Sequence, residues 1–278
     1  VSLLPCAPNS IHNLIRMTPA LNIAISAARA AGHTIIRNIN RRQDIKVHAK
    51  GVNDFVSEVD QQAEYEIITI IKKAYPDHAI IAEESGVHEG SHCEWIIDPL
   101  DGTTNYLHGI PHYCVSIAMR ENNKLQLGVV YDPVKEELFC ASRGEGATLN
   151  NRRIRVSTQK ELTASLIGTG LPYRTDQELD AYMATLRAML ENTSGIRRAG
   201  SAALDLAYVA AGRFDGFWEF GLNIWDIAAG VLLIQEAGGL VSDMDGGHDF
   251  LESGNLVAAN NKLFKTFLTT LNTASNSV

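Results

Sequence analysis

Two segments near the start of the chain carry apolar residues at the spacing of an amphipathic helix. Residues 19–39 and 58–75 each place apolar side chains mostly three, four or seven positions apart, and Pro76 ends the second segment. The stretch Gly51-Val52-Asn53-Asp54 between them is typical of a loop. The pattern therefore predicts two helices and a connecting loop before residue 76.

Shorter apolar runs follow, and their length favours strands over helices. Residues 79–82 form one such run, and residues 95–97 form another that ends at a carboxylate. Turn-forming residues then separate three further apolar runs, which predict successive strands at residues 113–119, 125–131 and 137–141.

The second half of the chain alternates helical patterns with short apolar runs. Helices are predicted at residues 178–191, 201–211, 222–236 and 261–271, and strands at residues 241–243 and 256–259, before a polar tail at residues 272–278. This order is neither a pure series of strand–helix–strand units nor a bundle. It predicts a mixed α/β (α+β) fold in which helices bury a sheet.

No internal repeat, low-complexity block or obvious linker interrupts the chain. We therefore expect residues 17–278 to form a single domain, since a chain of this size can bury one large core. Residues 1–16 fit no helix period and lack the charged start and long apolar stretch of a signal peptide. We expect this segment to be a non-native or disordered leader outside the domain.

The composition is ordinary for a globular enzyme, with 45% hydrophobic and 20% charged residues. The formal net charge of −8 argues against broad nucleic-acid binding, which usually needs a basic patch. No apolar run reaches the roughly 18 residues that a membrane span needs. The four cysteines are widely spaced and include no Cys-x-x-Cys pair, so we expect free thiols in a reducing cytoplasm.

The most informative segment reads Asp-Pro-Leu-Asp-Gly-Thr-Thr-Asn at residues 98–105, directly after the apolar run. Open α/β sheets bind ligands at the carboxyl ends of their strands, where Asp98 would lie. Pro99 biases Asp98 toward extended angles, so that Asp98 and Asp101 can face one point. Gly102 allows the backbone to approach a ligand closely. This order of carboxylates, glycine and hydroxyls suits a site that holds hard cations against a phosphate.

This segment resembles a signature of the inositol monophosphatase family, the Mg²⁺-dependent, lithium-sensitive phosphatases. Two further segments match the family in order and spacing: Glu83-Glu84-Ser85, and Trp225-Asp226-Ile227-Ala228-Ala229-Gly230 followed by Glu236-Ala237-Gly238-Gly239. The resemblance covers roughly residues 17–268. Within the family, residues 17–24 and 201–208 are most similar to the bacterial SuhB-type branch.

The resemblance implies a layered αβαβα sandwich of the type shared with fructose-bisphosphatases, and an active site with two or three Mg²⁺ ions. It implies that Glu83, Asp98 and the backbone carbonyl of Leu100 hold the first metal. Asp98, Asp101 and Asp226 would hold the second. Mg²⁺ prefers oxygen ligands, and two metals can clamp the entering and leaving oxygens of an in-line displacement at phosphorus.

By the same resemblance, Thr103 polarised by Asp60 orients the attacking water, and Glu83 contacts that water through its metal. The backbone N–H groups of Gly102 and Thr103 are expected to receive phosphate oxygens. Lys50 falls near a family lysine, although the loop spacing differs slightly. The implied substrate contacts are Glu83, Leu100, Asp101, Gly102, Thr103, Gly200, Ser201, Ala202, Glu219 and Asp226.

Each of these residues has a simpler interpretation when it is taken alone. Asp226 at a helix start is usually only a cap. Asp60 alone is an exposed helix-start acid, and Glu83-Glu84 alone is usually a solvated turn. Their occurrence together, in one order and at one spacing, is what favours a metal site.

Other motifs fail on spacing. The two aspartates of the central segment are three apart, whereas aspartyl-phosphate hydrolases use a pair two apart, and Leu100 stands where an EF-hand needs an oxygen ligand. His108 and His112 are four apart, but the glycine and proline between them rule out a regular helical zinc pair. We expect the nine histidines to be mostly surface groups without a ligand role.

Two functions follow from the resemblance. The first is Mg²⁺-dependent hydrolysis of inositol monophosphates to myo-inositol and phosphate, with glycerol phosphates or sugar phosphates as further substrates. The second is that of a regulatory binding protein of transcription antitermination, with or without catalysis, because the SuhB-type branch implies docking to a factor such as NusA. The resemblance also implies a cytoplasmic homodimer that acts on a small phosphorylated polyol.

Overall fold

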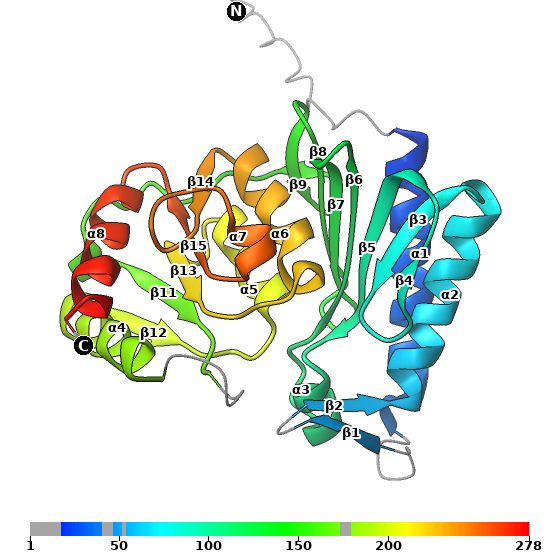
Figure 1. Ribbon diagram of the computed structural model, residues 1–278, viewed down its shortest axis with the longest axis horizontal. Helices are drawn as coiled ribbons and strands as arrows, with labels where there is room; N and C mark the ends of the chain where they lie inside the picture. The colour runs from blue at the N-terminus through cyan, green and yellow to red at the C-terminus, as the bar shows by residue number, and fades with distance from the viewer. Residues whose placement is uncertain (1–17, 41–46, 52–53, 173–178, 278) are drawn as a thin grey trace, which may run out of the picture.

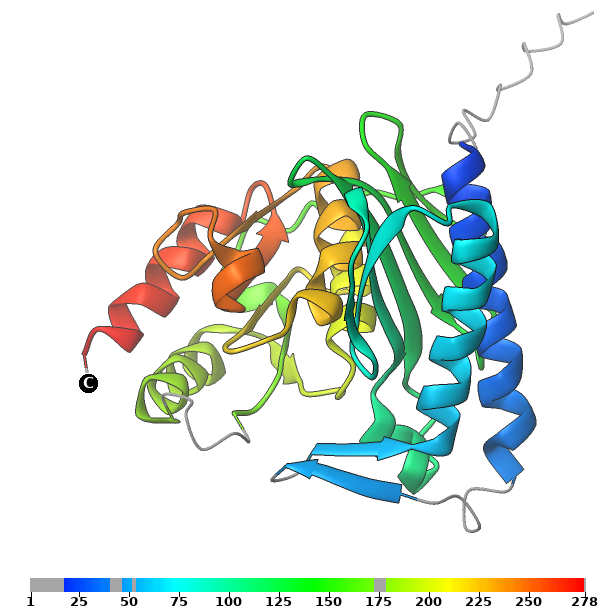
Figure 2. The same ribbon diagram turned by 45° about the vertical axis from the view of Figure 1, so that its right-hand side comes forward.

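The structure is a computed structural model, which describes residues 18–40, 47–51, 54–172 and 179–277. Helices and sheets alternate in five layers, in the order helix pair, large sheet, helix pair, small sheet, helix pair (Figures 1 and 2). The predicted αβαβα sandwich is therefore confirmed. The leader expected at residues 1–16 lies outside the described residues.

The first layer consists of α1 (Pro19–Asn38) and α2 (Glu58–Ala74), which pack side by side against the large sheet (Figure 2). Both helices begin at a side-chain cap: the Thr18 hydroxyl accepts from Leu21 N at 3.1 Å, and Ser57 forms a reciprocal capping box with Asp60. The buried face of α1 is rich in alanine, which allows the two helices to approach closely.

The large sheet has eight strands in the order β10-β9-β8-β7-β6-β5-β3-β4, and only the β3–β5 pair is parallel. Its other neighbours pair antiparallel, as hairpins of consecutive strands require. The strands are β3 (His78–Ala82), β4 (Gly86–His88), β5 (Ser91–Asp101), β6 (Cys114–Glu121), β7 (Lys124–Asp132), β8 (Glu137–Ser142), β9 (Gly146–Leu149) and β10 (Arg152–Arg153).

The central layer consists of α5 (Ala202–Ala210) and α6 (Ile224–Glu236), which are covered by a sheet on both sides. Their sequences are apolar on almost every side, as a helix buried between two sheets requires. Gly128 of β7 lets α6 approach the large sheet, because a Cβ at this position would lie 2.8 Å from the carbonyl oxygen of Ala229.

The small sheet has the order β12-β11-β13-β15-β14 and mixes parallel with antiparallel pairs. Helices α4 (Leu179–Asn192) and α8 (Phe264–Ser275) cover its outer face (Figure 1). The strands are β11 (Leu166–Thr169), β12 (Gly195–Arg197), β13 (Gly216–Glu219), β14 (Gly239–Ser242) and β15 (Leu256–Asn260). The remaining short elements are β1 (Val47–Gly51), β2 (Asp54–Ser57), α3 (Thr103–His108), α7 (Phe250–Ser253) and a 3₁₀ turn at Leu162–Ala164.

Two predicted elements are wrong in detail. The loop predicted at residues 51–54 is too long, because Gly51 ends β1 and Asp54 begins β2, and these two residues pair in an antiparallel ladder. The predicted polar tail begins too early, because α8 continues to Ser275 and keeps an apolar face through Leu271. No described helix combines the length and apolar character that crossing a membrane would need.

Candidate active site

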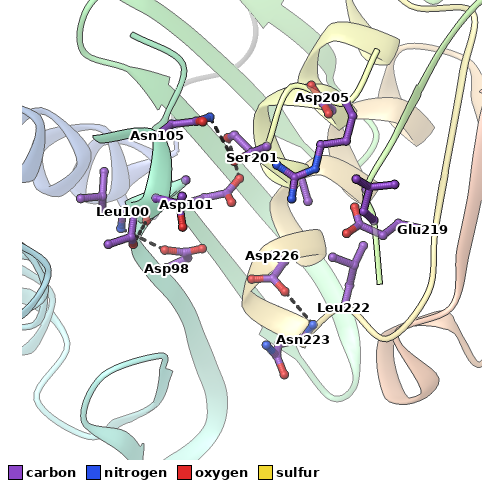
Figure 3. Close-up of a pocket in the computed structure, with 18 of the residues that line it drawn as sticks. Asp98, Leu100, Asp101, Asn105, Ser201, Asp205, Glu219, Leu222, Asn223 and Asp226 are labelled. Carbon is purple, nitrogen blue, oxygen red and sulfur yellow. Dashed lines mark hydrogen bonds between the residues drawn. The ribbon is translucent and has the colours of Figure 1, made fainter. Parts of the chain in front are cut away.

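A cavity of about 560 Å³ opens between the two sheets, beside the first turns of α5 and α6 (Figure 3). Its lining includes residues of β5, β13 and α3 and the loop before α5. Eleven of the predicted site residues line it: Glu83, Asp98, Leu100, Asp101, Gly102, Thr103, Gly200, Ser201, Ala202, Glu219 and Asp226. Asp60 lies behind the lining, and the side chain of Lys50 lies outside what the structure describes.

A β-bulge aims Asp98 and Asp101 at the same cavity. Side chains three apart on a regular strand point to opposite faces. In the β5–β6 ladder, however, Asp98 pairs with Ser116 and Asp101 with Cys114, so β5 has one extra residue between the pairs. Both aspartates therefore face the cavity, although β5 continues through Asp101 instead of ending at Asp98 as predicted.

The start of α5 fixes the carboxylate of Asp101. Ser201 Oγ and the backbone N–H of Ala203 both donate to Asp101 Oδ2 at 2.7 Å. Ser201 was predicted to contact substrate hydroxyls, and it lines the cavity, but its hydroxyl proton is directed at Asp101. Asp101 thus acts as an N-terminal anion for a helix distant in sequence.

Asn105, the last residue of the motif at residues 98–105, connects α3 to the loop before α5. Its side-chain amide donates to the carbonyls of His112, Ala199 and Gly200 at 2.8, 2.9 and 3.3 Å. The sequence marked Asn105 only as part of a motif, with no role. The structure makes it the residue that holds the Gly200–Ala202 wall beside Asp101.

Glu83 lies in the turn after β3, as the solvated-turn interpretation expected, but that turn is anchored. Glu64 of α2 accepts from the backbone N–H groups of Glu84 and Ser85, each at 2.8 Å. The N–H of Glu83 itself donates to the carbonyl of Ile97 at 3.1 Å. These bonds fix the position of Glu83 beside the end of β5.

Asp226 lies in the first turn of α6, where its carboxylate accepts from the backbone N–H of Asn223 at 2.7 Å (Figure 3). The cap interpretation is thus correct, and Asp226 also lines the cavity. The two roles are compatible because a carboxylate has two oxygens.

Thr103 and Asp60 form the predicted pair. Thr103 Oγ1 lies 2.8 Å from Asp60 Oδ1 and 3.1 Å from the carbonyl oxygen of Leu100. The interpretation of Asp60 as an exposed acid is wrong, because its side chain is fully buried. Burial raises the pKa of Asp60, while its bonds from Ser57 and Thr103 act in the opposite direction.

The charges of the cavity are predominantly negative. Burial, followed by the charges of Glu83, Asp101 and Asp226, raises the pKa of Asp98 well above its usual range. Burial also raises the pKa of Asp101. Among the described lining residues, Arg198 alone carries a permanent positive charge. A site with oxygen donors and excess negative charge fits hard divalent cations such as Mg²⁺.

Two side-chain contacts at the end of the cavity that carries Glu219 and Asp205 had no signal in the sequence. The carboxylate of Glu219 lies against Gly170, where a Cβ would come within 1.8 Å of Oε1. Asp205 Oδ1 lies 3.5 Å from His112 Nε2, and burial raises the pKa of Asp205 to about 6 despite this partner. Only the fold brings these pairs together, since each is separated by dozens of residues along the chain.

Comparisons with known proteins agree with this geometry. The model of the inositol monophosphatase family matches residues 16–276. The Nus factor SuhB of Pseudomonas aeruginosa is 56% identical over 261 residues, which cover 92% of this chain and 96% of that protein. The solved structure of the extragenic suppressor protein suhB from Bartonella henselae has a TM-score of 0.89 and 44% identity, covering 91% of this chain and 98% of that one. The inositol monophosphatase of Anabaena has a TM-score of 0.80 and 39% identity, with coverages of 92% and 96%.

Proposed function

Because the chain belongs to the inositol monophosphatase family, we propose that it is a Mg²⁺-dependent phosphatase that hydrolyses inositol monophosphates to myo-inositol and phosphate. One observation carries the proposal: four acidic residues line the same cavity as a threonine whose hydroxyl is bonded to a buried aspartate. The acidic residues are Glu83, Asp98, Asp101 and Asp226.

Glu83, Asp98 and the carbonyl of Leu100 would hold one Mg²⁺ ion. Asp98, Asp101 and Asp226 would hold another, so that Asp98 would contribute to both sites. When bound, the ions supply Lewis-acid stabilisation of the phosphoryl oxygens and an acidified water. The bonds that Asp101 and Asp226 receive from the starts of α5 and α6 orient these carboxylates before any ion binds, which limits the cost of ordering them.

Thr103 and Asp60 would position and deprotonate the attacking water. Thr103 Oγ1 donates its proton to Asp60 Oδ1, so its lone pairs can accept a proton of the water. Because burial raises the pKa of Asp60, this carboxylate is a stronger base than an exposed aspartate and can take up the proton through Thr103. The phosphate oxygens would accept from the backbone N–H groups of Gly102 and Thr103.

Glu219 gives the cavity its preference for a polyol. Its carboxylate lies on the wall opposite Asp98, where it would accept hydrogen bonds from the hydroxyls of the leaving alcohol (Figure 3). Gly200 and Ala202 complete that wall with backbone groups. Monoesters with fewer hydroxyls, such as glycerol phosphates, are expected to react more slowly.

The test is a phosphate-release panel over several monoesters, run with Mg²⁺, with a chelator and with lithium. We expect inositol monophosphates to give the highest kcat/KM, and chelator or lithium to suppress turnover. Asp101→Asn should lower kcat/KM on the order of 10²-fold or more. Asp245→Asn is the matched control, because Asp245 is exposed and does not line the cavity. Equal activity of the two variants would show that Asp101 is not part of the active site.

A second role is favoured by the name of the relative at 56% identity, which is a Nus factor. We propose that this chain also binds a transcription antitermination factor of the NusA type through its surface, with or without catalysis. Pull-down with such a purified factor should recover both the parent protein and Asp101→Asn. Failure to recover the parent protein would reject this role and leave the phosphatase proposal intact.

A further inference from the structure

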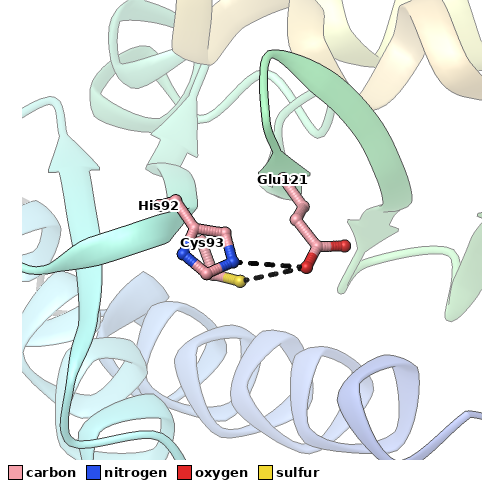
Figure 4. Close-up of side chains that lie close together, drawn as sticks. All are labelled: His92, Cys93 and Glu121. Atoms are coloured by element: carbon pink, nitrogen blue, oxygen red, sulfur yellow. Dashed lines mark hydrogen bonds and ion pairs between the residues drawn. The ribbon is translucent and has the colours of Figure 1, made fainter.

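A second group of metal-binding side chains lies at the start of β5, the end remote from Asp98 (Figure 4). His92, Cys93 and Glu121 each offer one ligand atom, and these three atoms lie within 4.8 Å of one another. Glu121 Oε1 is 3.5 Å from His92 Nε2 and 3.7 Å from Cys93 Sγ. In the described part of the chain, no other set of His, Cys, Asp or Glu side chains is grouped as closely.

Strand pairing explains how Cys93 reaches the carboxylate of Glu121. In the antiparallel β5–β6 ladder, Cys93 lies directly opposite Glu121, so the two side chains share one face of the sheet. On the other edge of β5, His78 of β3 pairs with Ser91 and Ala79 with Glu94, so His92 and Cys93 are extra residues against β3. The exposed ring of His92 also lies beside Glu121 of β6 (Figure 4).

We propose that His92, Cys93 and Glu121 bind Zn²⁺ or a similar borderline-soft divalent cation, with water as the fourth ligand. From Zn–N and Zn–O bonds of about 2.0–2.1 Å and a Zn–S bond of about 2.3 Å, a tetrahedral ion separates its nitrogen and oxygen ligands by roughly 3.3 Å and its sulfur and oxygen ligands by roughly 3.6 Å. The observed separations of 3.5 and 3.7 Å agree closely with these values. The proposal gives His92 a ligand role that the sequence analysis did not expect of the histidines.

The donor set selects zinc over magnesium. A thiolate and an imidazole suit Zn²⁺ and not Mg²⁺, and the charges of thiolate and carboxylate sum to −2, which balances the ion. Without a cation, burial and the charge of Glu121 raise the pKa of Cys93, so its thiol keeps its proton. Binding would transfer that proton to solvent. The exposure of His92 and Glu121, 65% and 43%, gives ions access from solvent.

His78, whose ring interacts electrostatically with His92, does not offer Nδ1 as a fourth ligand. His78 Nδ1 accepts from the indole N–H of Trp95 at 3.0 Å, so the other nitrogen of a neutral His78 ring carries the proton. Since the group of described residues offers three ligand atoms, water would take the fourth position, as in zinc sites with an open position. The ion would link the start of β5 to the end of β6. This site lies about 17 Å along β5 from Asp98. The inference does not rest on the proposed phosphatase activity.

The test is a titration with Zn²⁺ and Co²⁺ while excess Mg²⁺ occupies the carboxylate cavity. We expect one Zn²⁺ per chain at this site, and for Co²⁺ a thiolate charge-transfer band with the visible absorption of a tetrahedral ion. Cys93→Ser should abolish the band and weaken Zn²⁺ binding at least tenfold. His92→Ala and Glu121→Gln should weaken binding and leave phosphatase turnover with Mg²⁺ unchanged.

Two controls separate this site from the other thiols and acids. Cys140→Ser should keep the Co²⁺ band, because burial raises the pKa of Cys140 to about 12 and its thiol stays protonated. Glu89→Gln, an exposed neighbour on the β4–β5 loop, should keep Zn²⁺ affinity. A band that persists in Cys93→Ser, or the same Zn²⁺ affinity in His92→Ala as in the parent, would overturn the proposal. His92 is exposed, so its variant tests the site even if Cys93→Ser folds poorly.

Discussion

The side chains of the cavity carry more buried negative charge than a stable core would contain. Asp98 is only 2% exposed, and burial together with three neighbouring carboxylates raises its pKa. Removing water from like charges destabilises the metal-free protein, a cost that is typical of functional sites. A divalent cation would reverse the sign of this interaction.

Asp98→Asn should therefore stabilise the metal-free protein and abolish turnover. The amide removes a buried charge and keeps an oxygen that can accept from Leu100 N, the bond that Asp98 Oδ1 accepts at 2.9 Å. We expect a gain of about 1 kcal/mol or more at pH 7.5 in chelator, or a rise of about 2–4 °C in Tm. Calorimetry and phosphate release measure the two effects. A lower Tm of the variant in chelator would contradict the charge-crowding argument.

The contact between Gly170 and Glu219 is a second residue-scale feature with a measurable effect. Gly170→Ala places a Cβ within 1.8 Å of Glu219 Oε1, so the carboxylate must move from its position. If Glu219 binds the polyol, KM for inositol monophosphates should rise on the order of tenfold, with a smaller effect on kcat. Gly195→Ala is the control, since its Cβ would meet nothing closer than 3.5 Å. Equal KM values in Gly170→Ala and the parent protein would show that Glu219 does not bind the substrate.

At the scale of elements, the site depends on contacts between segments that are distant along the chain. The β-bulge of β5 aims two aspartates at the cavity, and the start of α5 fixes one of them. Asn105 joins α3 to the loop before α5 through three hydrogen bonds. Disturbing this junction should affect catalysis without removing a metal ligand.

Asn105→Ala tests the junction. The substitution leaves carbonyls of the 199–200 loop and of His112 without their donor, at a cost of about 1–3 kcal/mol. Because the loop carries Ser201, which orients Asp101, kcat should fall while affinity for the polyol changes less. Thermal unfolding and steady-state kinetics measure the two effects. Asn192→Ala is the control, because Asn192 is exposed and bonds one helical carbonyl; an equal loss in both variants would contradict the proposal.

At the scale of the whole molecule, five layers enclose the cavity between two sheets, and its charge couples stability to pH. Burial raises the pKa of several acids in or beside the cavity above their values in the unfolded chain. These acids are Asp60, Asp98, Asp101, Asp205 and Glu219. The folded protein therefore binds more protons than the unfolded chain, and its stability falls as pH rises through the raised pKa values.

We expect Tm in chelator to fall between about pH 4 and pH 7, and excess Mg²⁺ to remove most of that fall. Protonated Asp205 stabilises the folded protein. This stabilisation is fully present below the ordinary pKa of 3.8 and is lost as pH rises through about 6, the raised pKa, and it amounts to ~3 kcal/mol at most. Asp205→Asn should flatten part of the profile, and Asp245→Asn should not. Thermal scans across pH measure this. A Mg²⁺ stabilisation that shrinks as pH rises would contradict the assignment.

Two expectations at this scale stay predictions: the homodimer, which the family resemblance implies, and the single domain, which chain size and the absence of a linker favour. Sedimentation of the purified protein at several concentrations measures the first. For the second, one cooperative unfolding transition is expected, because the central helices α5 and α6 share their apolar faces between both sheets.

The sequence alone determined the local features of this protein. The periodicity of α1, α2 and α6 predicted their positions, since each carries its own apolar pattern and end signals. Seven of the eleven predicted residues that line the cavity lie in the motif at residues 98–105 and its two companion segments, and the family resemblance that these segments carry implied the other four. Short strands such as β11 and β13 escaped prediction, since their stability comes from neighbours in the sheet.

Only the tertiary structure decided which distant groups meet. The bulge that aims Asp98 and Asp101 at the cavity and the cross-strand pairing of Cys93 with Glu121 are properties of two strands together, since an extra residue or an opposite neighbour is defined only against the partner strand. The contact of Gly170 with Glu219 arises in the same way. Sequence fixes the chemistry that each side chain can perform, whereas burial and proximity, which set charge and affinity, exist only after the layers have packed.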